Sequence, residues 1–356
     1  MLQEFLKRWR RSHSPSASMT VPQLHLSHPK YRPDIDGLRA IAVLAVVAFH
    51  AFPNIVKGGF IGVDVFFVIS GYLISLIIFE NLDQGTFSFT EFYTRRVKRI
   101  FPALILVLVA CFAFGWFALP ADDFKQLGKH IAAGAGFISN FVLWNEAGYF
   151  DNSAETKPLL HLWSLGIEEQ FYIVWPLLLW CAWKRKFNLL TITVLVAIIS
   201  FFLNVKGVKA DATATFYSPQ TRFWELLSGS LLAWFVVYKN ESLQHVFSKV
   251  DGFLASLIYR DRQAEGKTLA NVLGFAGAFL LAYGFWRINK ELNFPGKWAL
   301  VPVVGTVSII MAGADAWINR IILSNKIAVW IGLISFPLYL WHWPLLSFAR
   351  MIEVEA

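Results

Sequence analysis

The sequence contains little cysteine and little charge. Its two cysteines, Cys111 and Cys181, lie in separate apolar runs and lack the spacing of metal ligands. We therefore expect reduced core residues at both positions, with no disulfide framework and no metal site. Charged residues make up 16% of the 356 residues, whereas a soluble domain averages about 25%. This shortage excludes an ordinary soluble protein.

A signal peptide, an internal repeat and a soluble domain are also missing from the pattern. The basic start MLQEFLKRWRR is followed by the polar stretch SHSPSAS rather than by an apolar run. We expect residues 1–32 to form a basic, disordered cytoplasmic tail, in which Met19 is an alternative start.

Apolar residues are abundant instead. They make up 56% of the chain, its mean hydropathy is +0.51, and it contains 33 Phe and 15 Trp. A helix needs about 20 such residues to cross a bilayer. We predict an all-α, polytopic integral membrane helix bundle with about nine or ten transmembrane helices. The predicted spans are approximately 38–53, 60–80, 100–119, 168–183, 188–204, 223–238, 269–287, 298–314 and 327–349.

The distribution of basic residues predicts the orientation of this bundle. The net charge is +8, but the basic residues fall mainly between apolar runs, so we expect a lipid bilayer and no nucleic acid as partner. The short Gly- and Ala-rich run 131–144 is predicted to be a re-entrant or surface segment. The N-terminus and most Lys and Arg, including KRK at 184–186, are then cytoplasmic. If that run spans, the bundle has a tenth span and KRK lies outside.

Ionisable side chains inside the apolar runs are the strongest indication of function. Such groups cost several kcal/mol at bilayer depth unless they pair or line a polar cavity. Arg39 and His50 lie eleven residues apart in one run, so a helix places them on one face about 16 Å apart along its axis. The set as a whole predicts chemistry or transport within the membrane.

We expect two polar clusters on opposite sides of the membrane. The cluster predicted in the outer half contains His50, Asp64, His161, Glu168, Glu169, Arg222, Glu225 and His342. The cluster predicted at the inner mouth contains Arg39, Arg95, Arg96, Lys98 and Arg99. Tyr339 shares a helix face with His342 by i,i+3 spacing. A base-rich site on one side and an anion-binding site on the other suit a reaction whose substrates come from opposite compartments.

Each feature taken alone has a simpler explanation. RRVKR at 95–99, taken alone, is explained better by a positive-inside membrane anchor than by a phosphate site, although guanidinium groups also bind phosphate in bidentate fashion. A single buried His is as often structural as catalytic. Arg222 with Glu225 is also explained by a helix-end ion pair, and His342 by an aromatic interface belt. The adjacent carboxylates at 168–169 are harder to explain without a partner.

Six sequence blocks in order resemble a known family. DGLRAIAVLAVVAFH, with Arg39 and His50 separated by ten residues, resembles the Arg-x10-His signature of the acyltransferase-3 family of membrane O-acyltransferases. The other five blocks are GGFIGVDVFFVISGYLIS, FYTRRVKRIFPAL, HLWSLGIEEQFYIVWPLL, YSPQTRFWELLSGSLLA and FPLYLWHWPLLSF. The resemblance runs from about residue 31 to the end of the chain. It is greatest to the bacterial branch that O-acetylates lipopolysaccharide, peptidoglycan or other surface glycans.

The resemblance implies substrates, a location and roles for individual residues. It implies acetyl-CoA as a cytoplasmic co-substrate with no bound cofactor, and a cell-envelope glycan such as lipopolysaccharide O-antigen as acceptor. It also implies a multi-pass protein of the bacterial inner membrane. Arg39 and His50 match the family's essential pair. The block thought to contact CoA is matched by Arg95, Arg96 and Arg99. Two further family blocks are matched by Asp64, Ser70, Glu168 and Tyr172.

The predicted mechanism is acyl transfer with His50 as the general base that removes the acceptor proton, a task that suits an imidazole. Asp64 or Glu168 is predicted to orient the His50 ring, as the acid does in a catalytic triad. Arg39 completes the catalytic set and holds the CoA. A transient acetyl-His50 that relays the group is an open alternative. Acceptor binding is predicted for His161, Glu169, Tyr172, Arg222, Glu225, Tyr339 and His342.

The chain differs from that family in two respects. Family members continue with a further span after the block that WHWPLLSFAR matches, and many carry a fused periplasmic SGNH hydrolase-like domain. We therefore expect 33–356 to be a membrane acyltransferase-3 domain that is incomplete at its C-terminus, with a separate periplasmic SGNH-type protein as partner. Two other functions stay open: a proton-coupled transporter or exporter, and an inactive, truncated membrane protein.

Overall fold

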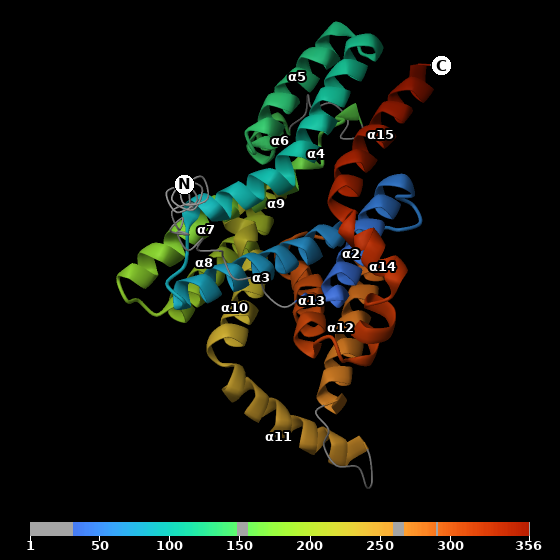
Figure 1. The fold of residues 1–356 in the computed structure, drawn as a ribbon. Coiled ribbons are helices and arrows are strands. Elements are labelled where there is room, and N and C mark those ends of the chain that lie inside the picture. Colours follow the sequence, from blue (N-terminus) through green and yellow to red (C-terminus); the bar gives the residue numbers. More distant parts are fainter. Residues whose placement is uncertain (1–30, 148–155, 259–266, 290, 356) are drawn as a thin grey trace, which may run out of the picture.

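The structure is a computed structural model that describes residues 31–147, 156–258, 267–289 and 291–355. Every regular element in these ranges is a helix, which confirms the predicted all-α fold (Figure 1). Residues 1–30 of the predicted tail lie outside the described residues. In chain order the elements are α2 (Pro33–Ala51), η1 (Gly59–Ile61), α3 (Gly62–Asp83), α4 (Phe89–Ala118), α5 (Ala121–Ala135), α6 (Ser139–Glu146), α7 (Leu162–Lys184), α8 (Leu189–Ala210), α9 (Ala212–Tyr217), α10 (Pro219–Tyr238), α11 (Asn240–Ile258), α12 (Lys267–Arg287), η3 (Gly296–Ala299), α13 (Leu300–Ala312), η4 (Asn319–Leu323), α14 (Lys326–Leu333) and α15 (Ser335–Glu355).

Several of these helices are suited to crossing a membrane. The four that are long and apolar enough are Gly59–Asp83, Phe89–Ala118, Leu189–Ala210 and Lys267–Arg287. A fifth is added if the bent pair of α14 and α15 counts as one span. The other predicted spans also fold as helices, and α2, α7 and α10 among them carry the ionisable residues. The fold is that of a polytopic membrane helix bundle.

Helix α3 lies at the centre of the bundle. In its most apolar stretch 78% of the residues are buried, against 33% in α4 and 22% in α8 and in α12. Helix α10 packs so closely on α3 that a Cβ atom on Gly71 would lie 1.8 Å from the carbonyl oxygen of Leu226. A Cβ atom on Gly229 would lie 2.1 Å from that of Val68. Small residues permit such backbone contact between membrane helices, and protein therefore encloses the polar residues of α3.

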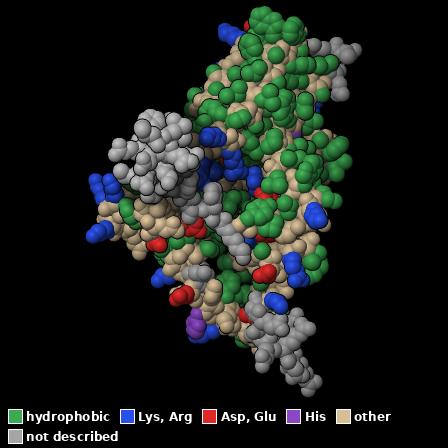
Figure 2. Space-filling model, in the orientation of Figure 1, with side chains coloured by type: hydrophobic (Ala, Val, Ile, Leu, Met, Phe, Trp, Pro, Cys, Tyr) green, Lys and Arg blue, Asp and Glu red, His purple; other side chains and the backbone are tan. Residues whose placement is uncertain are grey.

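The outer helices expose apolar side chains. Phe117 of α4, Ile198 of α8 and Phe279 of α12 are among the most exposed. Figure 2 shows hydrophobic side chains over the part of the surface formed by α4 and α5, with Lys and Arg gathered below it in the middle of the visible face. Apolar surface of this kind suits contact with lipid tails.

The predicted segment 131–144 is not one continuous helix. Helix α5 ends at Ala135 and α6 begins at Ser139, and Phe137 between them has a positive φ of 55°. Two short helices separated by such a break are too short to span a bilayer. The geometry agrees with the predicted re-entrant or surface segment.

An ion cluster ties this hairpin to the residues that precede α7. The carboxylate of Glu146 accepts hydrogen bonds from Lys129 Nζ at 2.7 Å and His130 Nε2 at 2.8 Å, and it pairs with Lys157 Nζ at 3.3 Å. Burial acts to raise the pKa of Glu146, but these donors outweigh it and lower the pKa to about 2. The hairpin is therefore held by charge as well as by packing.

The predicted span 327–349 is not one continuous helix. These residues form α14 and α15, which meet at a bend of 66°. Helix α14 lies so close to α2 that a Cβ atom on Gly332 would be 1.9 Å from the carbonyl oxygen of Asp36. The bend allows α15 to continue toward the other end of α2, where its His342 contacts His50.

Candidate active site

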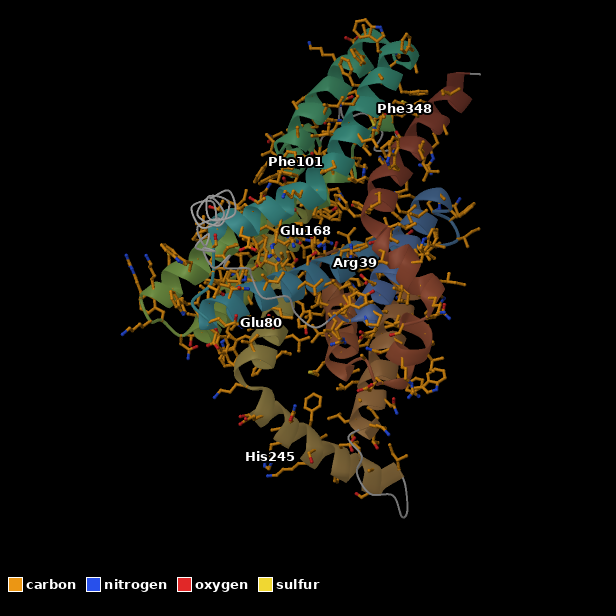
Figure 3. All side chains as sticks on the ribbon, in the orientation of Figure 1. Arg39, Glu80, Phe101, Glu168, His245 and Phe348 are labelled. Carbon is orange, nitrogen blue, oxygen red and sulfur yellow. The ribbon has the colours of Figure 1, made fainter. Side chains whose placement is uncertain are left out.

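Helices α2, α3, α4, α7 and α15 surround a cavity of about 640 Å³, called here the arginine cavity. Its charged lining residues are Arg32, Asp36, Arg39, Glu80, Arg96, Arg99, Glu168 and Glu169. Figure 3 places Arg39 and Glu168 near the middle of the bundle, whereas His245 lies apart on α11. A cavity with this lining offers charges of both signs to a ligand.

The start of α4 decides which of its arginines reach this cavity. Ser88 caps the helix by accepting a hydrogen bond from the backbone nitrogen of Glu91 at 3.4 Å. Arg96 and Arg99 share a face by i,i+3 spacing and line the cavity. Arg95 pairs instead with Glu91, one turn back on the same helix.

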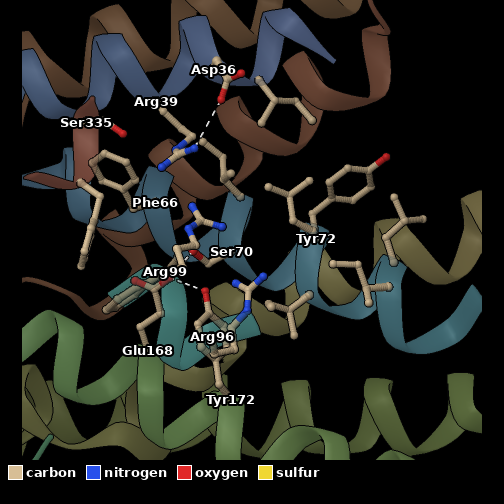
Figure 4. A pocket seen from close by; sticks show the side chains of 18 of the residues that line it. Asp36, Arg39, Phe66, Ser70, Tyr72, Arg96, Arg99, Glu168, Tyr172 and Ser335 are labelled. Carbon is tan, nitrogen blue, oxygen red and sulfur yellow. Dashed lines mark hydrogen bonds and ion pairs between the residues drawn. The ribbon is translucent and has the colours of Figure 1, made fainter. Parts of the chain in front are cut away.

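Hydrogen bonds hold the polar side chains around the arginine cavity (Figure 4). Glu168 of α7 accepts from the hydroxyls of Ser70 and Tyr172. Arg39 Nη1 donates to Asp36 Oδ1 at 3.3 Å, one turn earlier on α2. The Ser70 contact joins α3 to α7, whereas the Tyr172 contact lies within α7 and the Arg39 contact within α2.

Three buried polar atoms of residues that line this cavity have no hydrogen-bond partner within the described residues. They are Arg96 Nε, Glu169 Oε1 and Ser335 Oγ. A buried polar atom costs free energy unless a ligand or water satisfies it. The three atoms therefore indicate a site for a molecule that both donates and accepts hydrogen bonds.

A second cavity, of about 520 Å³, lies toward the other end of α2 and is called here the histidine cavity. Its ionisable lining residues are His50, Asp64, His161, Tyr217, Glu291, Arg222, Tyr339 and Arg350. Its other aromatic lining residues are Phe49, Phe60, Trp163, Phe216, Phe294 and Trp343. Aromatic walls with a few converging polar groups are typical of sites for small organic ligands.

Three imidazoles lie together at this cavity. His50 Nδ1 is 2.9 Å from His342 Nε2, and His342 Nδ1 is 2.6 Å from the carbonyl oxygen of Tyr339. The Trp343 ring packs against His50 with 4.4 Å between ring centroids. The His161 ring lies 5.5 Å from that of His342, and neither of its nitrogens has a partner in the described part of the chain. His161 is therefore available to a ligand.

A buried cluster of three charged residues borders the same cavity. Arg222 Nη2 is 3.1 Å from Asp64 Oδ1 and 3.2 Å from Glu225 Oε2, and each side chain is no more than 1% exposed. The rings 5.5 to 5.7 Å from the guanidinium carbon are those of Phe67, Trp163, Phe216 and Phe294. One cation shared by two carboxylates makes the cluster sensitive to the loss of any member.

The two cavities share the lining residues Val63 and Tyr339. The Tyr339 hydroxyl donates to the carbonyl oxygen of His161 at 2.9 Å and lies 2.6 Å from Ser164 Oγ. These bonds fix the ring at the boundary. Val63 and Tyr339 therefore lie between the two cavities.

Comparison with known proteins identifies the family. Residues 32–353 match the model of the acyltransferase-3 family, which is described as an acyltransferase domain. The chain belongs to the acyltransferase-3 family. The match covers both cavities and confirms the resemblance found in the six sequence blocks.

Two relatives of this acyltransferase-3 chain illustrate the match. It is 33% identical over 329 residues to the peptidoglycan O-acetyltransferase OatA of Listeria monocytogenes serovar 1/2a, a match that covers 89% of this chain and 50% of that protein. It is 31% identical over 332 residues to the O-acetyltransferase OatA of Staphylococcus aureus, covering 92% and 52%. The chain spans about half the length of the curated relatives it matches. No solved structure matches it significantly.

The acyltransferase-3 fold divides the predicted site residues between the cavities. Those in the histidine cavity are His50, Asp64, His161 and Arg222. Those in the arginine cavity are Arg39, Arg96, Arg99, Glu168, Glu169 and Tyr172. Tyr339 lines both cavities, whereas Arg95, Glu225 and His342 line neither. Direct substrate contact is therefore not supported for these last three residues.

The two glutamates of α7 belong to a different cluster from the one predicted. Glu168 and Glu169 were expected beside the histidines, but they line the arginine cavity. The reason is that α7 begins at Leu162 rather than at the predicted 168. Six residues move a side chain about 9 Å along a helix, and the glutamates thus lie deeper along α7.

The predicted carboxylate partner of His50 is not supported either. Glu168 is occupied by Ser70 and Tyr172, and Asp64 accepts from Arg222. The residue that contacts His50 Nδ1 is His342. Among the described residues, no three His, Cys, Asp or Glu side chains are grouped to hold a metal ion.

Arg350 is a residue of the histidine cavity that sequence reasoning missed. Arg350 donates to the backbone carbonyl of His50, and its guanidinium carbon lies 5.7 Å from the Trp343 ring centroid. Arg350 and Trp343 are seven residues apart on α15, so they share a helix face. That spacing within WHWPLLSFAR is the signal that could have revealed it.

Proposed function

We propose that this protein transfers an acetyl group from acetyl-CoA to a hydroxyl of a cell-envelope glycan. The observation that carries the proposal is a pair of chemically different cavities that meet at Val63 and Tyr339. One cavity is rich in arginine, and the other holds imidazoles among aromatic rings. Such a pair allows a donor and an acceptor to enter separately and to react where the cavities meet.

The arginine cavity is the proposed donor site. CoA carries phosphates, and guanidinium groups bind phosphate oxygens through paired, charge-assisted hydrogen bonds. Arg39, Arg96 and Arg99 supply these groups from α2 and α4. Ser335 Oγ and Arg96 Nε, which lack partners in the described ranges, suit the amides and carbonyls of the pantetheine arm. The cytoplasmic side of the membrane is the proposed entrance, because acetyl-CoA is cytoplasmic.

The histidine cavity is the proposed acceptor site. Aromatic walls suit the apolar faces of sugar rings, and the free nitrogens of His161 suit sugar hydroxyls. Because one relative is named a peptidoglycan O-acetyltransferase, peptidoglycan is the first acceptor to test, with lipopolysaccharide O-antigen as the second. The proposed setting is the bacterial inner membrane, with a cytoplasmic N-terminus and a separate SGNH-type protein as periplasmic partner.

His50 is the proposed general base. Its imidazole takes the proton of the acceptor hydroxyl while that oxygen attacks the thioester carbonyl. The C–S bond then breaks, the acetyl ester is formed, and the proton passes from His50 to the CoA thiolate. A relay through acetyl-His50 remains a second route to the same products. General base catalysis is typically worth about 10²–10⁴-fold in rate.

The test is ester-linked acetate on envelope glycans. Cells that express the wild-type chain, its His50→Ala variant or an empty vector are compared after both proteins are shown to reach the membrane equally. We expect acetate with the wild type and background levels with His50→Ala. Release of free CoA by the purified protein with radiolabelled acetyl-CoA and a glycan acceptor checks the reaction directly. Full acetylation by the His50→Ala variant contradicts the role of His50 as general base.

One observation favours a second candidate, a proton-coupled transporter. Asp64 and Glu225 share Arg222 in a fully buried cluster of the kind that carries protons through membrane proteins. Flux of a sugar or organic anion into vesicles, driven by a pH gradient and abolished in Asp64→Asn, identifies this function. Acetyl transfer without such flux supports the transferase.

A further inference from the structure

The hydrogen bonds around His342 define where its proton lies. A backbone carbonyl oxygen accepts hydrogen bonds and cannot donate them. His342 Nδ1, 2.6 Å from the carbonyl oxygen of Tyr339, therefore carries a hydrogen. The rings that contact His342 are those of His50, His161 and Tyr339. Within the described residues no carboxylate pairs with His342 to favour an imidazolium, since its hydrogen-bond partners are His50 and the Tyr339 carbonyl. In the neutral ring Nε2 is then an acceptor.

The position of the hydrogen on His342 also determines which nitrogen of His50 carries a hydrogen. His342 Nε2 lies 2.9 Å from His50 Nδ1. Because His342 Nε2 is the acceptor of this hydrogen bond, His50 Nδ1 must carry the hydrogen. In a neutral His50 with its hydrogen on Nδ1, the basic lone pair lies on Nε2. The three groups form one chain, in which His50 donates to His342 and His342 donates to the Tyr339 carbonyl.

We propose that His342 is a positioning residue that holds His50 in the tautomer whose Nε2 is the base. The catalytic meaning rests on the proposed function, but the tautomer itself does not. His50 lines the histidine cavity and His342 does not, which places His342 behind the reacting side chain. Arg350 and Trp343 hold the other parts of His50, through its backbone carbonyl and its ring face.

The proton inventory of the reaction is consistent with this role. The acceptor hydroxyl gives its proton to His50 Nε2, and the resulting imidazolium keeps its Nδ1 hydrogen directed at His342 Nε2. The proton on Nε2 then passes to the CoA thiolate, and the original tautomer is restored. His342 gains and loses nothing. It contributes an acceptor for the Nδ1 hydrogen of His50, and this hydrogen bond strengthens when His50 becomes positive. The acid of a catalytic triad has the same role.

A neutral imidazole suits this position better than a carboxylate. His342 is 6% exposed and lies among aromatic rings. A carboxylate there would be a buried charge whenever His50 is neutral, and buried unpaired charges are costly. The carbonyl of Tyr339 completes the chain without adding charge.

Nitrogen NMR of protein labelled with 15N-histidine tests the tautomer. The nitrogen shifts distinguish Nδ1–H from Nε2–H, and His50→Asn assigns the signals by their loss. We expect His50 in the wild type to show hydrogen on Nδ1. His342→Gln, whose amide oxygen replaces the acceptor, should keep this form, whereas His342→Phe should release His50 to the Nε2–H form. Nε2–H at His50 in the wild type, or no change in His342→Phe, overturns the proposal.

Kinetics separate positioning from packing. We expect His342→Phe to lower kcat by about 10²-fold with the KM for acetyl-CoA unchanged, and His342→Gln to stay within about tenfold of the wild type. Equal losses of kcat in both variants overturn the positioning role, because the Gln variant retains a hydrogen-bond acceptor and the Phe variant does not. The NMR result requires no turnover, so an inactive wild type with the Nδ1–H form counts against the proposed function and not against the tautomer.

Discussion

Individual arginines of this protein are placed by helix phase rather than by sequence neighbourhood. Arg95 and Arg96 are adjacent, yet a helix turns about 100° between them. Arg96 lines the arginine cavity, and Arg95 pairs with Glu91 outside it. The two residues therefore form a matched pair with the same chemistry and different surroundings.

Arg96→Ala should weaken the use of acetyl-CoA. The loss of a charge-assisted contact costs about 1.5–3 kcal/mol, which corresponds to roughly a 10- to 100-fold rise in the apparent KM for acetyl-CoA. Arg95→Ala is the control and should stay within about twofold of the wild type. The measurement is initial rate against acetyl-CoA concentration at saturating acceptor. Equal effects in the two variants would argue against the donor site.

Arg222→Leu should destabilise the fold strongly. It leaves Asp64 and Glu225 buried without their cation, and removal of one member of a buried ion pair costs about 3–5 kcal/mol. Asp64→Asn, which leaves one carboxylate for one arginine, should cost much less. Reversible unfolding in mixed micelles measures both free energies. A smaller loss in Arg222→Leu than in Asp64→Asn would contradict the shared-cation description.

At the scale of elements, the α5–α6 hairpin depends on one carboxylate. Lys129 and His130 come from α5, Glu146 ends α6, and Lys157 belongs to the residues before α7. The Trp343 indole nitrogen also donates to the carbonyl oxygen of Lys157 at 2.8 Å. The hairpin is thereby connected to the helix that carries His342.

The contribution of Glu146 should depend on pH. Its pKa of about 2 lies below its ordinary value of 4.5, so the ionised form stabilises the fold above pH 4.5 and the effect fades as the pH falls toward 2. Glu146→Gln should lower the Tm at neutral pH, and the difference from the wild type should shrink between those two values. Thermal unfolding in detergent measures it, with exposed Glu241→Gln as control. A difference that is constant with pH contradicts the ion cluster.

At the scale of the whole molecule, the bundle holds two separate cavities that share a boundary of two residues. Helix α3 supplies Val63 and α15 supplies Tyr339 at the boundary. The bend of 66° between α14 and α15 makes this possible, because α14 packs beside Asp36 while α15 reaches His50. A straight final helix would lose one of these contacts.

Val63→Phe should obstruct the boundary. A larger side chain there should lower acetyl transfer by at least about tenfold while acetyl-CoA binding changes by less than about twofold. Val63→Ala, which widens the boundary, should retain both. Equilibrium binding of acetyl-CoA and transfer to a glycan acceptor are measured on the same preparations, with Tm as a check of folding. Transfer at the wild-type rate in Val63→Phe rules out this route.

Particular residues show how far sequence reasoning reached. The helical class and the separation of Arg39 from His50 along one helix were predicted, since both follow from local periodicity. The position of Glu168 was not, because it depends on a helix start six residues earlier than apolarity indicated. Arg95 was grouped with its neighbours because the sequence of a short basic block does not indicate which of its residues face the interior of the bundle.

By itself, the sequence determined the membrane helix class and the family, because the lengths of apolar runs and the order of six blocks are properties read along the chain. Only the tertiary structure decided which polar groups meet. His50 and His342 are 292 positions apart, and their contact depends on how α15 bends past α2. Glu168 lies with the arginines for the same reason: partners of buried polar groups are chosen by packing between helices.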